Sequence, residues 1–370
     1  MDKAILDAVA SGAYIMGKPV KELEAQLAEY VGVKHCLSCA NGTDALTLAL
    51  KAWGIGPGDA VFVPDFTFFS SAEVVPLEGA TPVFVDVCED TFNIDATDLQ
   101  RAVEQVLAEG RLKPRVVVAV DLFGLPADYP AIRAVADKYG LLILEDGAQG
   151  FGGSIVMADS DRPSRACSFG DIATTSFFPA KPVGCYGDGG AVFTDNDEWA
   201  ALIESYRVHG KGEFKYDNVR IGMNSRLDTV QAAVLQVKLK AFAEYELDAV
   251  NKAAALYSER LKGLATPVVP EGFRSSWAQY TIRFSDSAER DKVQAFLKAS
   301  GIPSMVYYPK PMHLQTAFQA EYTLSFRAES RNLCPVATSL CERVLSLPMH
   351  PYITDEEINT VCNAVKAALK

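Results

Sequence analysis

The chain is short of positive charge and has no long apolar run. Among its 370 residues, 35 Lys and Arg stand against 47 Asp and Glu, which gives a formal net charge of −12. Nucleic acids and anionic membranes attract basic surfaces, so neither is expected as a general partner. The longest apolar runs, such as 116–120, are far shorter than the ~20 residues that span a bilayer. Charged residues also interrupt the first ten positions, so we expect no signal segment and a cytoplasmic protein.

Histidine is rare, and the eight cysteines are scattered. Cys36 and Cys39 form a C-x-x-C, a spacing used in redox and zinc sites. No second such pair and no His pair follows at zinc spacing, and the four histidines are dispersed. Disulfide frameworks belong to short secreted chains. We therefore expect no metal site, and we expect Cys36 and Cys39 to be buried thiols beside a strand.

The first 200 residues alternate β-branched apolar runs with amphipathic stretches. Runs that are apolar on both faces are typical of buried parallel strands, and spacings of 20–35 residues fit βαβ units. The sequence therefore predicts an α/β fold with a mostly parallel sheet and helices on both faces. The expected strands are 61–63, 83–85, 116–120, 141–144, 171–175 and 190–193, and the expected helices include 43–53 and 130–139.

The pattern changes in the last third of the chain. A long helical pattern runs from about 227 to 264. Beyond it, the sequence predicts a smaller α+β unit with strands 280–284 and 305–308 and helices 289–299, 338–344 and 355–369. We therefore predict a large domain at 1–245 and a small C-terminal domain at 246–370.

Polar residues that follow the strands are candidates for a ligand site, because ligands bind beyond the carboxyl ends of parallel strands. Asp146 follows the strand at 141–144, where it could hold a ligand or cap a helix. Lys181 lies between Ala180 and Pro182 after the strand at 171–175. A desolvated lysine has a lowered pKa and becomes a nucleophile able to form a Schiff base. The alternative is a lysine on an exposed loop.

Gly42 and Thr43 begin a helix after Asn41, where free N–H groups could bind a phosphate or simply be capped. The stretch 184–190 is rich in glycine, which permits close backbone approach. A phosphate-binding helix N-terminus, a strand-end carboxylate and a buried lysine 35 residues later are what an enzyme of pyridoxal phosphate requires.

With these motifs in order, the chain resembles the DegT/DnrJ/EryC1/StrS family of sugar-nucleotide aminotransferases, which share the aspartate aminotransferase-like type I fold. The similarity extends over nearly the whole chain. Two departures are a nearly absent segment before residue 12 and a stretch at 155–166 of unmatched length, expected as a surface excursion. The matching motifs are 12–17, 41–46, 64–68, 145–149, 176–181, 187–190, 224–228, 307–309 and 347–351.

The resemblance implies a role for each matched residue around pyridoxal phosphate. Lys181 would form the Schiff base and then move protons, and Asp146 would pair with the pyridine nitrogen. Asn224 would reach the cofactor phosphate from the neighbouring subunit, which implies a homodimer with composite sites. The remaining cofactor contacts would be Gln149 beside the phenolic oxygen, Phe68 stacked on the ring, and Gly42, Thr43 and Ser176 at the phosphate.

The resemblance also implies where the sugar nucleotide binds, namely at Arg226, Tyr307, Tyr308 and His313. The segment 207–226 is locally basic and could attract a diphosphate, although a solvated loop would look the same. Its charged residues are Arg207, Lys211, Lys215, Arg220 and Arg226 against Glu213 and Asp217.

The resemblance also bears on the carbon that is aminated: Gln149 stands where the family carries His or Gln, and Gln is more frequent in members that aminate C-3 of the keto-sugar. The motifs are most similar to those of enzymes acting on UDP-linked 2-acetamido-3-oxo-hexuronic acids, with L-glutamate as amino donor, in aminosugar synthesis for lipopolysaccharide or other cell-surface polysaccharides. Arg226 could bind the sugar carboxylate with two hydrogen bonds or pair with an acid such as Asp228.

Three alternatives remain open. The first is a C-4 aminotransferase of a nucleotide-linked 4-keto-6-deoxyhexose. The second is a lyase or desulfurase with Cys185 as sulfur acceptor. The third is a non-catalytic scaffold or regulator, against which the presence of Lys181, Asp146 and Asn224 argues.

Overall fold

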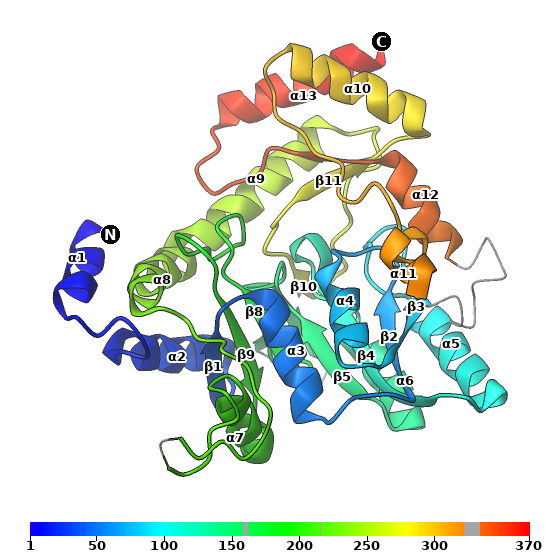
Figure 1. Cartoon of the computed structure of the whole chain (residues 1–370). Coiled ribbons are helices and arrows are strands. Elements are labelled where there is room, and N and C mark those ends of the chain that lie inside the picture. Colours follow the sequence, from blue (N-terminus) through cyan, green and yellow to red (C-terminus); the bar gives the residue numbers. More distant parts are fainter. Residues whose placement is uncertain (158–161, 215, 322–333) are drawn as a thin grey trace.

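The computed structural model describes residues 1–157, 162–214, 216–321 and 334–370, and it is built on one seven-stranded sheet (Figure 1). Five neighbouring strands of that sheet are parallel, as the sequence predicted. In sheet order the strands are β1 (His35–Cys39), β9 (Gly190–Thr194), β8 (Ile172–Ser176), β5 (Leu142–Asp146), β4 (Lys113–Val120), β2 (Asp59–Pro64) and β3 (Thr81–Val85).

Strand β9 differs from the expectation, because it runs antiparallel to both of its neighbours. All five residues of β9 are buried, as are the residues of β2. The predicted burial of this strand on both faces is therefore confirmed, whereas its predicted parallel direction is wrong. A buried antiparallel strand has the same apolar pattern as a parallel one, and only the length of its connection separates the two.

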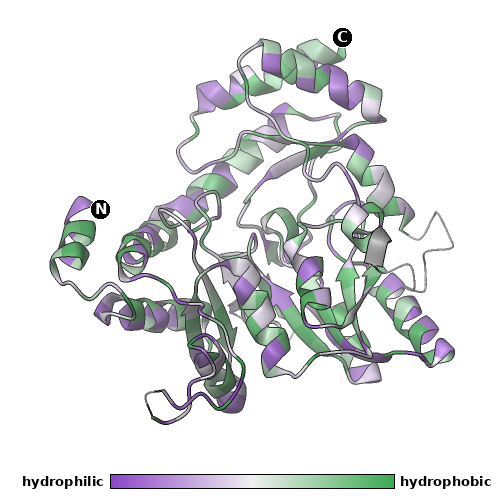
Figure 2. Ribbon diagram, in the orientation of Figure 1, coloured by the Kyte–Doolittle hydropathy of each residue, from purple (hydrophilic) through white to green (hydrophobic). Residues whose placement is uncertain are grey.

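Helices cover both faces of this sheet and turn their apolar sides toward it (Figure 2). One core lies under α3, α4 and α7, and a second lies under α5 and α6. A third core joins α2 and α8 to β9, and α1 packs on α8. The bounds are α1 (Asp2–Ala10), α2 (Lys18–Val31), α3 (Gly42–Ala52), α4 (Ser70–Leu77), α5 (Ala96–Glu109), α6 (Tyr129–Tyr139), α7 (Asp197–Tyr206) and α8 (Thr229–Ala241).

The long helix expected at 227–264 is present with an irregular centre. It consists of α8, a π-helical turn at Phe242–Glu246 and α9 (Leu247–Arg260). The expected boundary between residues 245 and 246 falls in this turn, and the two-domain division stays a prediction. None of the described helices is long and apolar enough to cross a membrane.

The C-terminal part has its own core, made by α9, a two-stranded sheet and two helices. The strand expected at 305–308 is wrong: Met305 makes only an isolated bridge to Ser346. Pro309 and Pro311 follow at once and have no N–H to continue a ladder. The partner strand is instead β12, which begins at Val344, a residue expected to be helical. The elements are β11 (Tyr280–Arg283), α10 (Ser287–Ala299), α11 (Thr316–Glu321), α12 (Pro335–Arg343), β12 (Val344–Leu347) and α13 (Asp355–Leu369).

The expected excursion at 155–166 contains a small antiparallel sheet. Strands β6 (Ser154–Val156) and β7 (Pro163–Arg165) pair with each other, and β10 (Phe273–Arg274) pairs with β6. Residues 158–161, between β6 and β7, lie outside the described residues.

Candidate active site

Asp146 at the carboxyl end of β5 and Lys181 after β8 interact through their charges. Asp146 is the last residue of β5, and only 5% of it is exposed. Its carboxylate accepts hydrogen bonds from Ser71 Oγ at 2.7 Å and from the backbone N–H of Ala148 at 3.2 Å. Lys181 follows β8, and its backbone N–H donates to the carbonyl of Phe178 at 2.8 Å. The strand-end positions predicted from the sequence therefore meet on one edge of the sheet.

Burial changes the acidity of both groups. It lowers the pKa of Lys181, and the Asp146 charge opposes that shift. Burial raises the pKa of Asp146, while the hydrogen bonds from Ser71 and Ala148 and the charge of Lys181 oppose the rise. A lysine with a lowered pKa is more often neutral near pH 7 and can act as nucleophile and base.

The N-terminus of α3 and the end of β8 form a cradle for an anion. Asn41 caps α3 by accepting from the Asp44 N–H at 2.8 Å, so the N–H groups of the first helical residues remain open to a ligand. A Cβ on Gly42 would lie 2.8 Å from Ser176 Cβ, so only glycine fits this approach. Thr43 Oγ1 lies 2.8 Å from Ser70 Oγ. Gly42, Thr43 and Ser176, the residues predicted at the cofactor phosphate, thus lie together.

Two aromatic residues and an amide stand beside Asp146. Phe68 is 52% exposed, and its ring centroid lies 6.2 Å from that of Tyr308. Gln149 Oε1 accepts from the Phe123 N–H at 2.7 Å, and its Nε2 donates to the Tyr308 hydroxyl at 3.0 Å. These bonds fix the orientation of the Gln149 amide. Burial raises the pKa of Tyr308, so its hydroxyl stays protonated.

This residue set fits pyridoxal phosphate. The cradle at Gly42 matches a phosphate, the buried Asp146 carboxylate matches a pyridinium nitrogen, and Lys181 supplies an amine for the aldehyde. The half-exposed ring of Phe68 offers an aromatic face for stacking.

The segment 207–226, here called the arm, carries Asn224, predicted at the cofactor phosphate, and Arg226, predicted at the sugar nucleotide. Asn224 pairs with Val208 across the arm, and Arg226 lines a separate surface hollow of about 1000 Å³. Arg207 is buried and pairs with Glu24 at 2.6 Å and with Glu204, so it is not available to a diphosphate. Lys215, which also entered the charge argument, lies outside the described residues.

His313 and Tyr307 lie near the carboxyl end of β2. His313 Nδ1 lies 2.6 Å from Asp65 Oδ2, and its backbone N–H donates to Asp65 Oδ1 at 2.8 Å. Sequence reasoning gave Asp65 no role, although it directly follows β2. Tyr307 contacts Tyr308, with ring centroids 5.7 Å apart.

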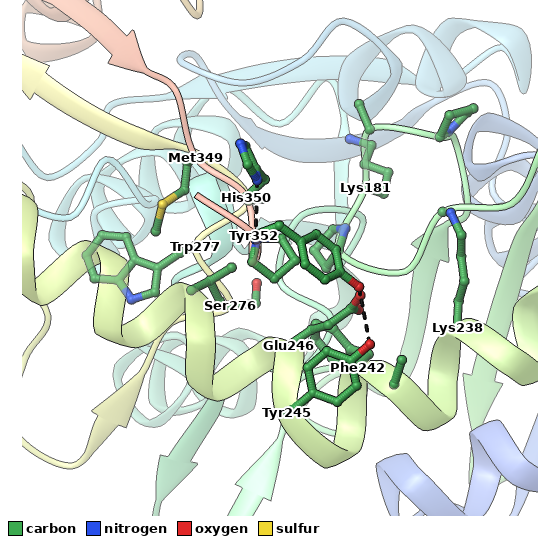
Figure 3. A pocket seen from close by; sticks show the side chains of 18 of the residues that line it. Lys181, Lys238, Phe242, Tyr245, Glu246, Ser276, Trp277, Met349, His350 and Tyr352 are labelled. Atoms are coloured by element: carbon green, nitrogen blue, oxygen red, sulfur yellow. Dashed lines mark hydrogen bonds between the residues drawn. The ribbon is translucent and has the colours of Figure 1, made fainter. Parts of the chain in front are cut away.

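A cavity of about 770 Å³ begins at Lys181 and runs between α8–α9 and the segment 349–352 (Figure 3). The Tyr245 and Tyr352 hydroxyls lie 3.2 Å apart, and Tyr352 also donates to Glu246. Lys238 lies over the Tyr186 ring at 4.9 Å. The motif at 347–351 marked this region, but the sequence did not single out Lys238 or Tyr352.

Seven of the eight cysteines are buried, and Cys88 is exposed. Cys36 and Cys39 are free and buried, and burial raises the pKa of Cys39 to about 12. Burial also raises the pKa of Cys185, which makes it a poor sulfur acceptor. In the described part of the chain, no group of three possible metal ligands occurs.

The sequence profile described as the DegT/DnrJ/EryC1/StrS aminotransferase family matches residues 1–366. The chain is similar to three curated proteins over nearly its whole length. It is 43% identical to a protein of Pseudomonas aeruginosa named UDP-2-acetamido-2-deoxy-3-oxo-D-glucuronate aminotransferase, covering 99% of this chain and 95% of that one. It is 40% identical to the UDP-N-acetyl-3-dehydro-alpha-D-glucosamine 3-aminotransferase of Acidithiobacillus ferrooxidans, covering 96% and 90%. It is also 40% identical to a pleiotropic regulatory protein of Geobacillus stearothermophilus, covering 95% and 90%.

Solved structures agree with this similarity. The chain superposes on a DegT DnrJ EryC1 StrS aminotransferase from Brucella abortus with a TM-score of 0.91 and 48% identity, covering 99% of this chain and 94% of that one. A sugar aminotransferase of Streptococcus pneumoniae, solved in its PMP form, matches with a TM-score of 0.88 and 25% identity, covering 99% and 96%. The fold is therefore that of these aminotransferases, as the sequence predicted.

Proposed function

Because the chain belongs to the DegT/DnrJ/EryC1/StrS aminotransferase family, whose members depend on pyridoxal phosphate, we propose that it transfers an amino group from L-glutamate to C-3 of a UDP-linked 2-acetamido-3-oxo-hexuronic acid. The observation that carries this substrate is the 43% identity, over 99% of the chain, to the Pseudomonas aeruginosa protein whose name states it. The Acidithiobacillus relative is also named for a 3-keto UDP sugar, which supports C-3 over C-4.

In this proposal each residue of the site has one task. Bound pyridoxal phosphate supplies an electron-withdrawing ring and an aldehyde carbon that accepts and returns the amine. Asp146 keeps a negative charge at the ring nitrogen, and Lys181 Nζ removes and returns the proton at the reacting carbon. Gly42, Thr43 and Ser176 hold the phosphate. Phe68 stacks on the face of the pyridine ring, and Gln149 contacts its phenolic oxygen.

The sugar nucleotide would occupy the cavity that begins at Lys181. Its volume of about 770 Å³ is within the usual range for small-molecule sites. Tyr307, Tyr308 and His313 do not line this cavity, so they would meet a part of the sugar that extends beyond it. Because Asp65 engages His313 Nδ1, the Nε2 atom is the one left for a ligand.

Arg226 and Asn224 would reach the site of a second subunit in a homodimer. The arm exposes large apolar side chains that a partner would cover, with Phe214 72% and Ile221 91% exposed. Mixing Lys181→Ala with Asn224→Ala subunits tests this arrangement. A composite site predicts recovery of about a quarter of wild-type activity, because half of randomly assorted dimers carry one intact site. No recovery would contradict it.

The substrate is tested by product analysis. Purified enzyme, pyridoxal phosphate and L-glutamate are incubated with the UDP-linked 3-oxo-hexuronic acid and, in parallel, with a nucleotide-linked 4-keto-6-deoxyhexose, and the amine position is read by NMR. The proposal predicts an amine at C-3 of the first sugar. Amination of the second sugar alone would favour the C-4 alternative.

The proposal also includes a cytoplasmic location and a role in cell-surface polysaccharide synthesis. A regulatory function is the second candidate, because one relative is named a pleiotropic regulatory protein. Asp146 is buried, Lys181 is half-buried, and their charges interact, the arrangement that turnover requires and regulation does not, and this favours an enzyme.

A further inference from the structure

Two buried carboxyl groups lie behind the cofactor site. Asp121 follows β4, and Glu145 precedes Asp146 on β5; neither Asp121 nor Glu145 is exposed at all. Successive residues of a strand face opposite sides, so Glu145 points away from the side that Asp146 faces. Glu145 and Asp146, both acidic, act on Asp121 through their charges. Two fully ionised carboxylates here would repel each other in a medium of low dielectric.

Glu145 is surrounded by donors suited to an anion. Its Oε2 accepts from the N–H groups of Phe169 at 2.7 Å and Gly170 at 2.9 Å, and its Oε1 accepts from the Cys167 N–H. A carboxylate that accepts three backbone N–H bonds is strongly stabilised in its charged form. The structure around Glu145 therefore favours the ion at this position.

Only one of the two carboxylate oxygens of Asp121 has hydrogen-bond donors. Its Oδ1 accepts from the Ala127 N–H at 3.0 Å and from the Tyr129 hydroxyl at 2.8 Å. Its Oδ2 is buried and has no hydrogen-bond partner. A Cβ on Gly150 would lie 2.3 Å from this Oδ2, so the turn after β5 closes directly over it. A buried acceptor without a donor is costly, but a proton on Oδ2 turns the atom into a donor.

We propose that Asp121 and Glu145 share one proton, held on Asp121 Oδ2 and donated to the Glu145 carboxylate, so that the pair carries a single negative charge. Glu145 lies within side-chain hydrogen-bonding reach of Asp121. Burial raises the pKa of Asp121 well above its ordinary value, and the charge of Glu145 adds to that rise. Burial raises the pKa of Glu145 to about 7, while its hydrogen bond with Asp121 opposes the rise. Tyr129, which also faces the pair, keeps its proton because burial raises its pKa.

The pair makes Asp121 a positioning residue for the site. Its backbone N–H donates to the Asp146 carbonyl at 3.1 Å, and the turn that carries Gln149 packs on its side chain. One charge fewer beside Asp146 also makes it easier for Asp146 to stay ionised. This last consequence rests on the role proposed for Asp146 at the ring nitrogen.

Infrared spectroscopy of the holoenzyme in D2O at neutral pH tests the shared proton. The wild type should show the C=O stretch of a protonated, buried carboxylic acid, and Asp121→Asn should lose that band. Asp171→Asn is the matched control: Asp171 directly precedes β8 of the same sheet, and its carboxylate pairs with Arg133 at 3.3 Å. That variant should keep the band. A wild type without the band, or Asp121→Asn with the band intact, would overturn the proposal.

If Asp121→Asn does not fold, isotope labelling of the wild type replaces it. The band should shift when aspartate carboxyls are labelled with carbon-13, and the shift should persist in Asp146→Asn. A band that moves only with glutamate labelling, or that vanishes in Asp146→Asn, would place the proton elsewhere. None of these readouts uses a sugar substrate, so they stand or fall independently of the proposed reaction.

Discussion

At the scale of residues, the lowered pKa of Lys181 is the property that makes the proposed chemistry possible. Burial lowers the pKa of the Lys181 amine, while the charge of Asp146 opposes that shift. An exposed lysine would be almost fully protonated at pH 7 and could not remove a proton from carbon.

Replacing Lys181 by Ala should lower the rate of the glutamate half-reaction by about 10³-fold or more, since positioned acid–base groups contribute 10²–10⁴-fold. Lys181→Arg should be equally inactive, because arginine keeps the charge but cannot lose its proton. Single-turnover formation of 2-oxoglutarate measures the rate, and circular dichroism verifies the fold.

Lys238→Ala is the control, because Lys238 lines the same cavity but lies over Tyr186. It should keep the glutamate half-reaction. A Lys181→Ala enzyme that turns over normally would refute the assignment.

Sequence reasoning placed the strand-end residues well and the packed partners poorly. Asp146, Gln149 and Lys181 follow strands, and position along a parallel sheet is readable from an apolar run. Asp65 and Asp121 also follow strands, but their roles depend on His313 and Glu145, which are far away in sequence. The tertiary fold brings such pairs together, so no spacing within a short stretch of sequence indicates them.

At the scale of elements, the close contact of α3 with β8 requires glycine at position 42. Gly42→Ala puts a Cβ 2.8 Å from Ser176 Cβ and must displace the cradle. Overpacking of this kind costs about 1–3 kcal/mol, so we expect pyridoxal phosphate affinity to fall by about tenfold. Fluorescence titration of the apoprotein measures it.

The matched control is Gly56→Ala, where the nearest atom to the new Cβ is Glu78 O at 3.7 Å. This variant should bind the cofactor like the wild type. Equal losses in both variants would show that the α3 cradle is not the phosphate site.

Helix α2 is tied to the arm by a buried ion pair. Arg207 and Glu24 meet at 2.6 Å, and Glu24 also accepts from the Ser38 N–H at 2.9 Å. Glu24→Ala leaves Arg207 with Glu204 as its remaining ion-pair partner, so we expect a loss of about 3 kcal/mol in the free energy of unfolding. Urea denaturation measures this loss.

Asp7→Ala breaks an exposed pair with Lys3 and should change stability little. If both variants are equally stable, the buried pair does not hold the arm.

The elements themselves were predicted where periodicity is strong. The parallel strands and the long helix were found, whereas β9 was given the wrong direction and 305–308 the wrong structure. The direction and pairing of a strand depend on which strand lies beside it in the sheet. A five-residue apolar run does not indicate which strand that is.

At the scale of the whole molecule, the Asp121–Glu145 pair should make stability depend on pH. Its pKa values are raised in the folded state, so the native protein holds a proton that the unfolded chain releases above about pH 4.5. That contribution to stability is complete below this pH and is lost as pH rises through the folded pKa of about 7 and above.

The free energy of unfolding of the wild type should therefore fall relative to that of Asp121→Asn by up to about 1.4 kcal/mol per pH unit. Urea denaturation of both proteins at about pH 5 and about pH 7 measures the difference, in which other titrating groups cancel. Parallel pH profiles for the two proteins would contradict the shared proton.

The central claim is that this chain is a pyridoxal phosphate aminotransferase in which Lys181 forms the Schiff base with the cofactor. The most direct measurement is a visible absorbance spectrum of the purified protein with pyridoxal phosphate, before and after L-glutamate, followed by borohydride reduction and peptide mapping. The account predicts cofactor attached to the Lys181 peptide before glutamate. After glutamate it predicts conversion to pyridoxamine phosphate with release of 2-oxoglutarate. A protein that shows no cofactor band, or cofactor attached at another lysine, would contradict it.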